Sequence, residues 1–89
     1  MRTYIVTLAV TDNARRANME NHLRSYGFYC PIHDNCWAVK VNKTAADIRD
    51  DLMKLQQPGD RIFVVRSGTE AAWNATYGEK NTEWLKEHL

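Results

Sequence analysis

Four short strand-like runs and two amphipathic helical patterns follow one another along the first three quarters of the chain. The strand-like runs are rich in β-branched and aromatic residues and alternate in side-chain character. The helical patterns repeat their apolar residues with the spacing of an α-helix. In chain order, the segments cover residues 3–10, 11–27, 28–32, 36–41, 44–55 and 61–67. The order strand, helix, strand, strand, helix, strand excludes most other small folds.

The two helical patterns have recognisable ends. Asp12 or Asn13 can cap the first helix, and Gly27 is placed to end it. Thr44 and Asp47 resemble a capping box, with aspartate in place of the usual glutamate. The apolar stripes are Met19, Leu23 and Tyr26, and Ile48, Leu52 and Leu55. We therefore predict a ferredoxin-like α+β fold, an antiparallel four-stranded sheet with both helices on one face.

The first strand predicts which side of the sheet is buried. One side carries Tyr4, Val6, Leu8 and Val10, which would face the two helices. The other side carries Ile5 and Ala9, and Ala38 of the third strand and one side of RIFVV in the fourth strand join them. This second face should be open, although it is not strongly polar. Because open apolar faces usually meet another chain, we expect a homodimer.

The last twenty residues, 70–89, are additional to the minimal fold. Asn81 or Thr82 can cap a short terminal helix there. Trp84, Leu85 and Leu89 would dock this helix, and Trp73 would anchor the segment before it. We therefore expect one domain over residues 1–89, with residues 70–89 forming a helical C-terminal extension.

The stretch CPIHDNC, residues 30–36, has three interpretations. Cys30, His33 and Cys36 could bind zinc, although the spacing is not that of a zinc knuckle and a fourth ligand is missing. The two thiols could also pair across a hairpin, although cytoplasmic thiols are normally reduced. Asp34 and Asn35 suit a tight turn. We favour the third interpretation, a β-hairpin with two unpaired thiols, no metal site and no cofactor.

Twelve basic and eleven acidic residues give a net charge of +1, so overall charge indicates no particular partner. The basic residues are nevertheless in excess before residue 46, which could create one basic face. Candidates for contacts with RNA or DNA phosphates are Arg15, Arg16, Arg24, Lys40 and Lys43. The alternative is an ordinary solvated helix surface.

The apolar runs are too short to span a membrane, and MRTYIVTLAV alternates like a strand and lacks a cleavage site. We therefore expect a cytoplasmic protein with no membrane contact.

The chain resembles the small CRISPR-associated adaptation nucleases, and most closely their stand-alone SinR-like relatives. The resemblance rests on YIVTLAV, RSYGFY, NCWAVKV, TAADIRDDLMKL, DRIFVVRSG and the tail with EAAW and WLKEHL. It covers nearly the whole chain. The resemblance implies a dimeric ferredoxin-like protein, and we expect an association with mobile elements. The nuclease members of the family place an aspartate at the end of the first strand. A divalent metal is thought to be shared there between two subunits.

This chain departs from the family at that position, which is Ala9. Asp12, three residues later, is the remaining candidate for a catalytic metal ligand, although helix capping explains it better. We therefore expect a binding or regulatory protein without catalysis, acting on nucleic acid or on a protein partner. The alternative is a metal-dependent endoribonuclease or deoxyribonuclease at a dimer interface, with Asp12 on the metal and Arg15 and Arg16 on the phosphate backbone.

Overall fold

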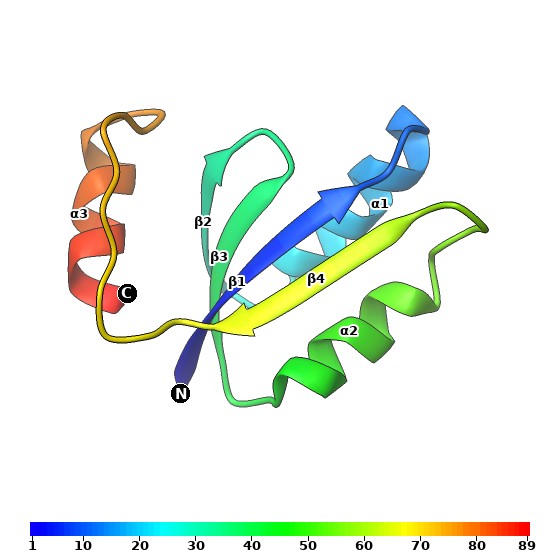
Figure 1. Ribbon diagram of the computed structural model, residues 1–89, viewed down its shortest axis with the longest axis horizontal. Coiled ribbons are helices and arrows are strands. Elements are labelled where there is room, and N and C mark those ends of the chain that lie inside the picture. Colours follow the sequence, from blue (N-terminus) through cyan, green and yellow to red (C-terminus); the bar gives the residue numbers. More distant parts are fainter.

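The computed structural model describes residues 1–89, which form a four-stranded sheet and three helices (Figure 1). The strands are β1 (Arg2–Ala9), β2 (Phe28–His33), β3 (Cys36–Val41) and β4 (Arg61–Arg66). The helices are α1 (Asn13–Arg24), α2 (Ala45–Met53) and α3 (Glu79–His88). None of the three helices has the length and apolar character needed to cross a membrane.

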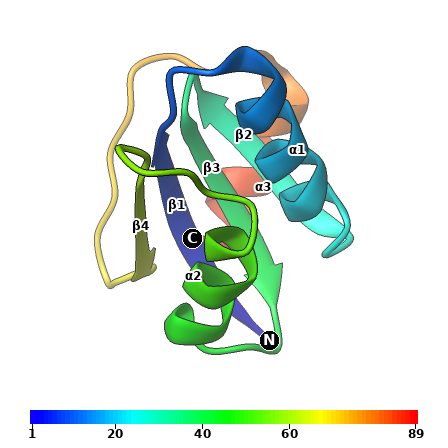
Figure 2. The same ribbon diagram turned by 90° about the vertical axis from the view of Figure 1, so that its right-hand side faces the viewer.

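The sheet has the strand order β2-β3-β1-β4, and all neighbouring strands are antiparallel. Strand β1 is central and pairs with β3 on one side and β4 on the other. Helices α1 and α2 cover one face of the sheet, and α3 lies on the other (Figure 2). The predicted ferredoxin-like α+β fold with a C-terminal helix is therefore confirmed.

The main core lies between the sheet and the first two helices. The β1 side chains predicted to face the helices are all at most 5% exposed. They pack against Met19 and Leu23 of α1 and against Ile48 and Leu52 of α2. The outer members of the predicted helical stripes, Tyr26 and Leu55, lie beyond the helix ends and are half-buried against this core.

The helix caps follow the sequence pattern. The Asp12 side chain accepts a hydrogen bond from the backbone N–H of Arg15 at 2.8 Å, so Asp12 is the cap of α1. Gly27 follows the helix with φ of +92°, a conformation that glycine adopts without strain. Thr44 and Asp47 exchange both hydrogen bonds of the predicted capping box, each at 3.1 Å.

CPIHDNC forms the β2–β3 hairpin, as favoured from the sequence. Its turn is Asp34–Asn35, and Asn35 has a left-handed φ of 64°. Pro31 lies in β2, an edge strand, where a missing N–H can face away from the ladder. Cys30 and Cys36 are buried and unpaired.

The expectation of a fully open second face is wrong. Helix α3 packs over the β2–β3 half, where Leu85 forms a second core cluster with Cys30 and Ala38. Trp73, Trp84 and Leu89 pack against this cluster, which explains their presence in the tail. The helix also begins earlier than predicted, at Glu79 after Gly78, and has no side-chain cap. Packing of the apolar side chains therefore outweighs the missing cap.

Candidate functional site

The β1–β4 half of the second sheet face is the part that α3 leaves uncovered. Thr3 and Ile5 at the start of β1 also face outward, but they are covered by contacts with α3 and its cluster. The remaining five outward side chains of this half define the open strip: Thr7, Ala9, Arg61, Phe63 and Val65. Phe63 is 61% exposed and Val65 is 44% exposed, values far above those of core residues. Strand β4 is also an edge strand, with one row of backbone groups unpaired by the sheet.

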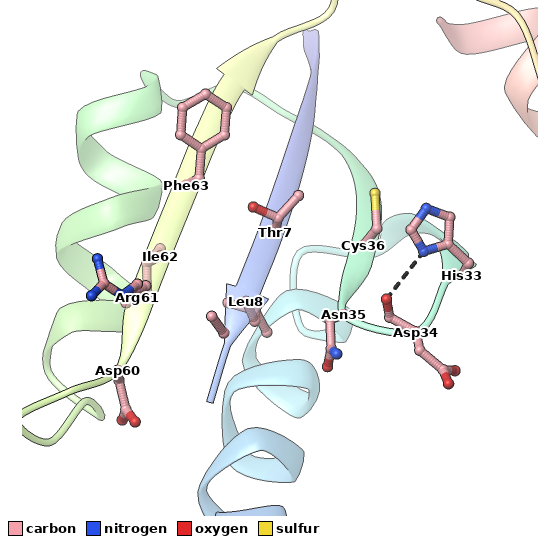
Figure 3. Close-up of a pocket in the computed structure, with 11 residues that line it drawn as sticks. Thr7, Leu8, His33, Asp34, Asn35, Cys36, Asp60, Arg61, Ile62 and Phe63 are labelled. Carbon is pink, nitrogen blue, oxygen red and sulfur yellow. Dashed lines mark hydrogen bonds between the residues drawn. The ribbon is translucent and has the colours of Figure 1, made fainter. Parts of the chain in front are cut away.

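A hollow of about 790 Å³ lies at one end of the open strip, between β4 and the β2–β3 hairpin. Figure 3 shows Phe63 and Thr7 projecting from β4 and β1, with Cys36 and His33 on the hairpin side. Ala9 also lines this hollow. A second and more apolar hollow, of about 470 Å³, lies between Val65 and the segment that carries Trp73.

Asp60, one of the two acidic residues that line the larger hollow, is held by an ion pair with Arg15. Arg15 of α1 donates to the two Asp60 carboxylate oxygens from Nε at 2.5 Å and from Nη2 at 2.8 Å. The backbone N–H of Gln57 adds a third hydrogen bond at 2.9 Å. The hydrogen bond from Arg15 lowers the pKa of Asp60, and the same bond raises the pKa of Arg15. This pair joins α1 to the turn before β4, so Arg15 is not free to bind phosphate.

The thiol in this hollow is not activated. Burial raises the pKa of Cys36, which keeps the thiol protonated and weakly nucleophilic at neutral pH. His33, its partner across the hairpin, places Nδ1 3.1 Å from the Asp34 backbone oxygen. The Asp34 carboxylate accepts a hydrogen bond from Tyr77 at 2.8 Å. No three His, Cys, Asp or Glu residues of the chain are grouped so that they could hold a metal ion.

Asp12 and Ala9, the two residues considered for a catalytic metal site, have different structural roles. Asp12 uses Oδ2 to cap α1 and lies 3.9 Å from Arg15 Nη1. Ala9, at the end of β1, brings no ligand atom to the hollow that it lines.

Two of the basic candidates lie at opposite ends of α1. Arg16 donates to Asn13 at 3.1 Å, near the start of the helix. Arg24 donates to Asn21 at 2.8 Å and lies over the Trp37 ring, 4.9 Å from its centroid. Eight residues of helix separate the two arginines by about 12 Å along the axis. They do not form one compact phosphate site.

Lys40 and Lys43 lie on different faces of the sheet. Lys40 Nζ lies 3.1 Å from Nδ1 of His88, on the side covered by α3. Lys43 belongs to the β3–α2 connection, where it donates to Asp51 at 3.0 Å. The structure thus does not bring the five predicted basic residues together.

A different group of basic residues does converge. Arg2, Lys43 and Arg66 line a polar hollow of about 520 Å³ beside the start of α2. Sequence reasoning missed Arg2 and Arg66 because they lie 64 positions apart and no local pattern connects them. Only the antiparallel pairing of β1 with β4 places the start of one strand beside the end of the other.

Comparison with solved structures shows the fold. A crystal structure of a hypothetical protein, TT1823 from Thermus thermophilus, superposes with a TM-score of 0.69. It is 21% identical and covers 84% of this chain and 92% of its own. No family model and no curated protein matches this chain. This similarity shows a shared fold and gives no information about activity.

Proposed function

We propose that this chain is a non-catalytic binding protein that works as a homodimer through the open strip. The observation that carries the proposal is the exposure of Phe63 and Val65 on an edge strand, next to a sheet half that α3 has already covered. Because α3 already buries apolar side chains of the β2–β3 half, this face of the sheet is able to bury apolar surface. A second copy of the chain would cover the remaining half in the same way.

The geometry favours association around a two-fold axis. In such an interface each copy presents the same surface, so Phe63 would be buried twice. The unpaired edge of β4 adds backbone groups that two antiparallel copies could pair. Burial of one large apolar side chain contributes about 1.5–3 kcal/mol. Two copies of Phe63 can therefore supply a substantial part of the binding free energy.

Kinship with the stand-alone SinR-like relatives of the CRISPR-associated adaptation nucleases is part of this proposal. Its support is the fold, which is the one that the resemblance implies, together with the quoted sequence segments. The nuclease alternative has less support, because Ala9 offers no metal ligand and Asp12 caps α1. A nucleic acid partner does not follow from the five predicted basic residues, which are dispersed.

The substitution Phe63→Ser tests whether the open strip is the dimer interface. Sedimentation velocity over a concentration series should show a dimer for the natural chain. The dissociation constant of the variant should be at least about 100-fold higher, because a two-fold interface loses the aromatic ring twice.

Phe28→Ser is the matched control. Phe28 is 50% exposed and lies on β2, the opposite edge strand, so the substitution removes the same side chain from another surface. This control should remain dimeric. A natural chain that sediments as a monomer, or a dimer lost in the Phe28 variant and kept in the Phe63 variant, would refute the proposed interface.

A further inference from the structure

Three basic side chains from separate parts of the chain meet at one end of the molecule. The start of β1, the end of β4 and the start of α2 lie together there (Figures 1 and 2). Arg2, Lys43 and Arg66 line the hollow between these elements, with Thr44 and Asn42 contributing neutral polar groups. The hollow is therefore polar and positively charged, unlike the two hollows of the open strip.

Two of these cations have no partner within the chain. Arg2 and Arg66 make no side-chain hydrogen bond and no ion pair, whereas Arg15 is held by Asp60 and Lys43 by Asp51. Arg66 lies opposite Tyr4, two residues along β1 from Arg2 and on the same face. Like charges at such diagonal positions on neighbouring strands repel each other. An anion between them would remove this repulsion.

The third cation is held in place by the core. The hydroxyl of Tyr4, a residue only 2% exposed, donates to the backbone carbonyl of Lys43 at 2.7 Å. This bond fixes the β3–α2 connection beside the ends of β1 and β4. The carboxylate in the hollow, Asp47, is engaged by the backbone N–H of Thr44 in the capping box. It offsets only part of the positive charge.

We infer that this basic hollow, formed by Arg2, Lys43 and Arg66, is a binding site for phosphate groups. The two unpartnered guanidinium groups suit phosphate because each can donate two parallel hydrogen bonds to its oxygens. The N-terminus of α2 adds positive potential. Phosphate of this kind is carried both by a nucleic acid backbone and by a free polyphosphate, so both sources are tested. The site lies outside the open strip and does not require the dimer.

The experiment uses two probes on the full chain at low salt, a labelled single-stranded oligonucleotide and inorganic pyrophosphate as a competitor. The test variant combines Arg2→Gln and Arg66→Gln. The matched control combines Arg16→Gln and Arg24→Gln, which removes the same charge and residue type from α1. We expect the test variant to bind at least about tenfold more weakly while the control keeps nearly full affinity.

The salt dependence gives an independent readout. Each lost contact to a single-stranded backbone should flatten the plot of log affinity against log salt by about 0.7. Arg2→Lys combined with Arg66→Lys keeps the charge but loses the paired guanidinium hydrogen bonds, so its affinity should lie between those of the natural chain and the test variant. Displacement of the oligonucleotide by pyrophosphate would show that free phosphate groups suffice, whereas binding of the oligonucleotide alone would assign the site to a phosphodiester chain.

Two results would overturn the inference. One is an equal loss of affinity in the test and control variants, which would indicate nonspecific charge. The other is the absence of binding of either probe at low salt. Sedimentation of the Arg2 and Arg66 double variant should match that of the natural chain, so failure of this site and failure of the proposed dimer are separately visible.

Discussion

At the scale of single residues, Asp51 of α2 is the most constrained polar group. Its Oδ2 accepts hydrogen bonds from the hydroxyl of Tyr26 at 2.7 Å and from Lys43 at 3.0 Å. His22 Nε2, which is buried and makes no hydrogen bond, lies 3.5 Å away. The hydrogen bond from Tyr26 is the main reason that the pKa of Asp51 falls to about 2. Burial, with help from the same bond, raises the pKa of Tyr26.

This lowered pKa predicts how stability depends on pH. Because the folded pKa of Asp51 lies below its ordinary value of 3.8, its stabilising contribution is complete above about pH 4 and is lost as the pH falls toward 2. We expect Asp51→Asn to lower the free energy of unfolding by about 1 kcal/mol at pH 7, after allowance for solvent screening. Between pH 4 and pH 2, the free energy of unfolding of the variant should also fall less than that of the natural chain. Urea unfolding at a series of pH values measures both effects.

Asp50→Asn provides the control for this measurement. Asp50 is the neighbouring residue, is exposed and pairs only with Arg49. Its substitution should change stability by a few tenths of a kcal/mol at most. Equal pH profiles for the Asp51 variant and the natural chain would contradict the role given to the Tyr26–Asp51 bond.

At the scale of elements, α3 is the part that distinguishes this molecule from a minimal ferredoxin-like domain. It has no side-chain cap, and its position depends on apolar packing. Leu85 is 1% exposed and contacts the cluster of Cys30 and Ala38. The hydroxyl of Thr3 also donates to the carbonyl of His88 at the end of the helix. These contacts make α3 an integral part of the sheet's second layer.

Leu85→Ala should therefore release or loosen α3. Removing a fully buried leucine costs about 2–5 kcal/mol, depending on how well the site collapses. The fluorescence of Trp84 and Trp73, which pack on the same cluster, should shift toward that of exposed tryptophan. Lys86→Ala, on an exposed position of the same helix, is the control and should leave the spectrum unchanged. An unshifted spectrum with unchanged stability in the Leu85 variant would show that α3 does not dock as described.

At the scale of the whole molecule, the two candidate surfaces are of opposite character and lie on different faces. The open strip carries exposed Phe63 and Val65, with Arg61 as its one charge, and lies on the face shared with α3. The strand register places Arg2 and Arg66 on the helix face of the sheet. The separation of the two surfaces means that a dimer could present two basic hollows at once. Two linked sites would strengthen binding to a continuous polyanion beyond the affinity of either one.

If the chain is dimeric, its thermal stability must depend on protein concentration. A dimer that dissociates on unfolding is stabilised by mass action. We expect the midpoint of thermal unfolding to rise by about 3–5 °C for each tenfold increase in concentration. At concentrations at which the Phe63→Ser variant sediments as a monomer, its midpoint should be independent of concentration. A concentration-independent midpoint in the natural chain would argue for a monomer.

Local patterns predicted the parts of this protein that depend on neighbouring residues. Alternation along β1, the cap at Asp12, the capping box at Thr44 and the turn at Asp34–Asn35 all follow from interactions within a few residues. Such interactions are present in any conformation that contains the element. The fold class followed because the order of elements leaves few ways to bury their apolar faces.

Contacts between distant residues were decided only by the tertiary structure. The sequence indicated that Leu85 and the tryptophans would pack, but not that they would cover the β2–β3 half and leave Phe63 exposed. Likewise, the sequence showed that Arg15 is basic, but its pairing with Asp60 depends on how α1 lies against the turn before β4. Arg2 and Arg66 become neighbours only when β1 pairs with β4. The sequence by itself therefore determined the elements and their buried sides, whereas the surfaces available for binding depend on long-range packing that no local pattern encodes.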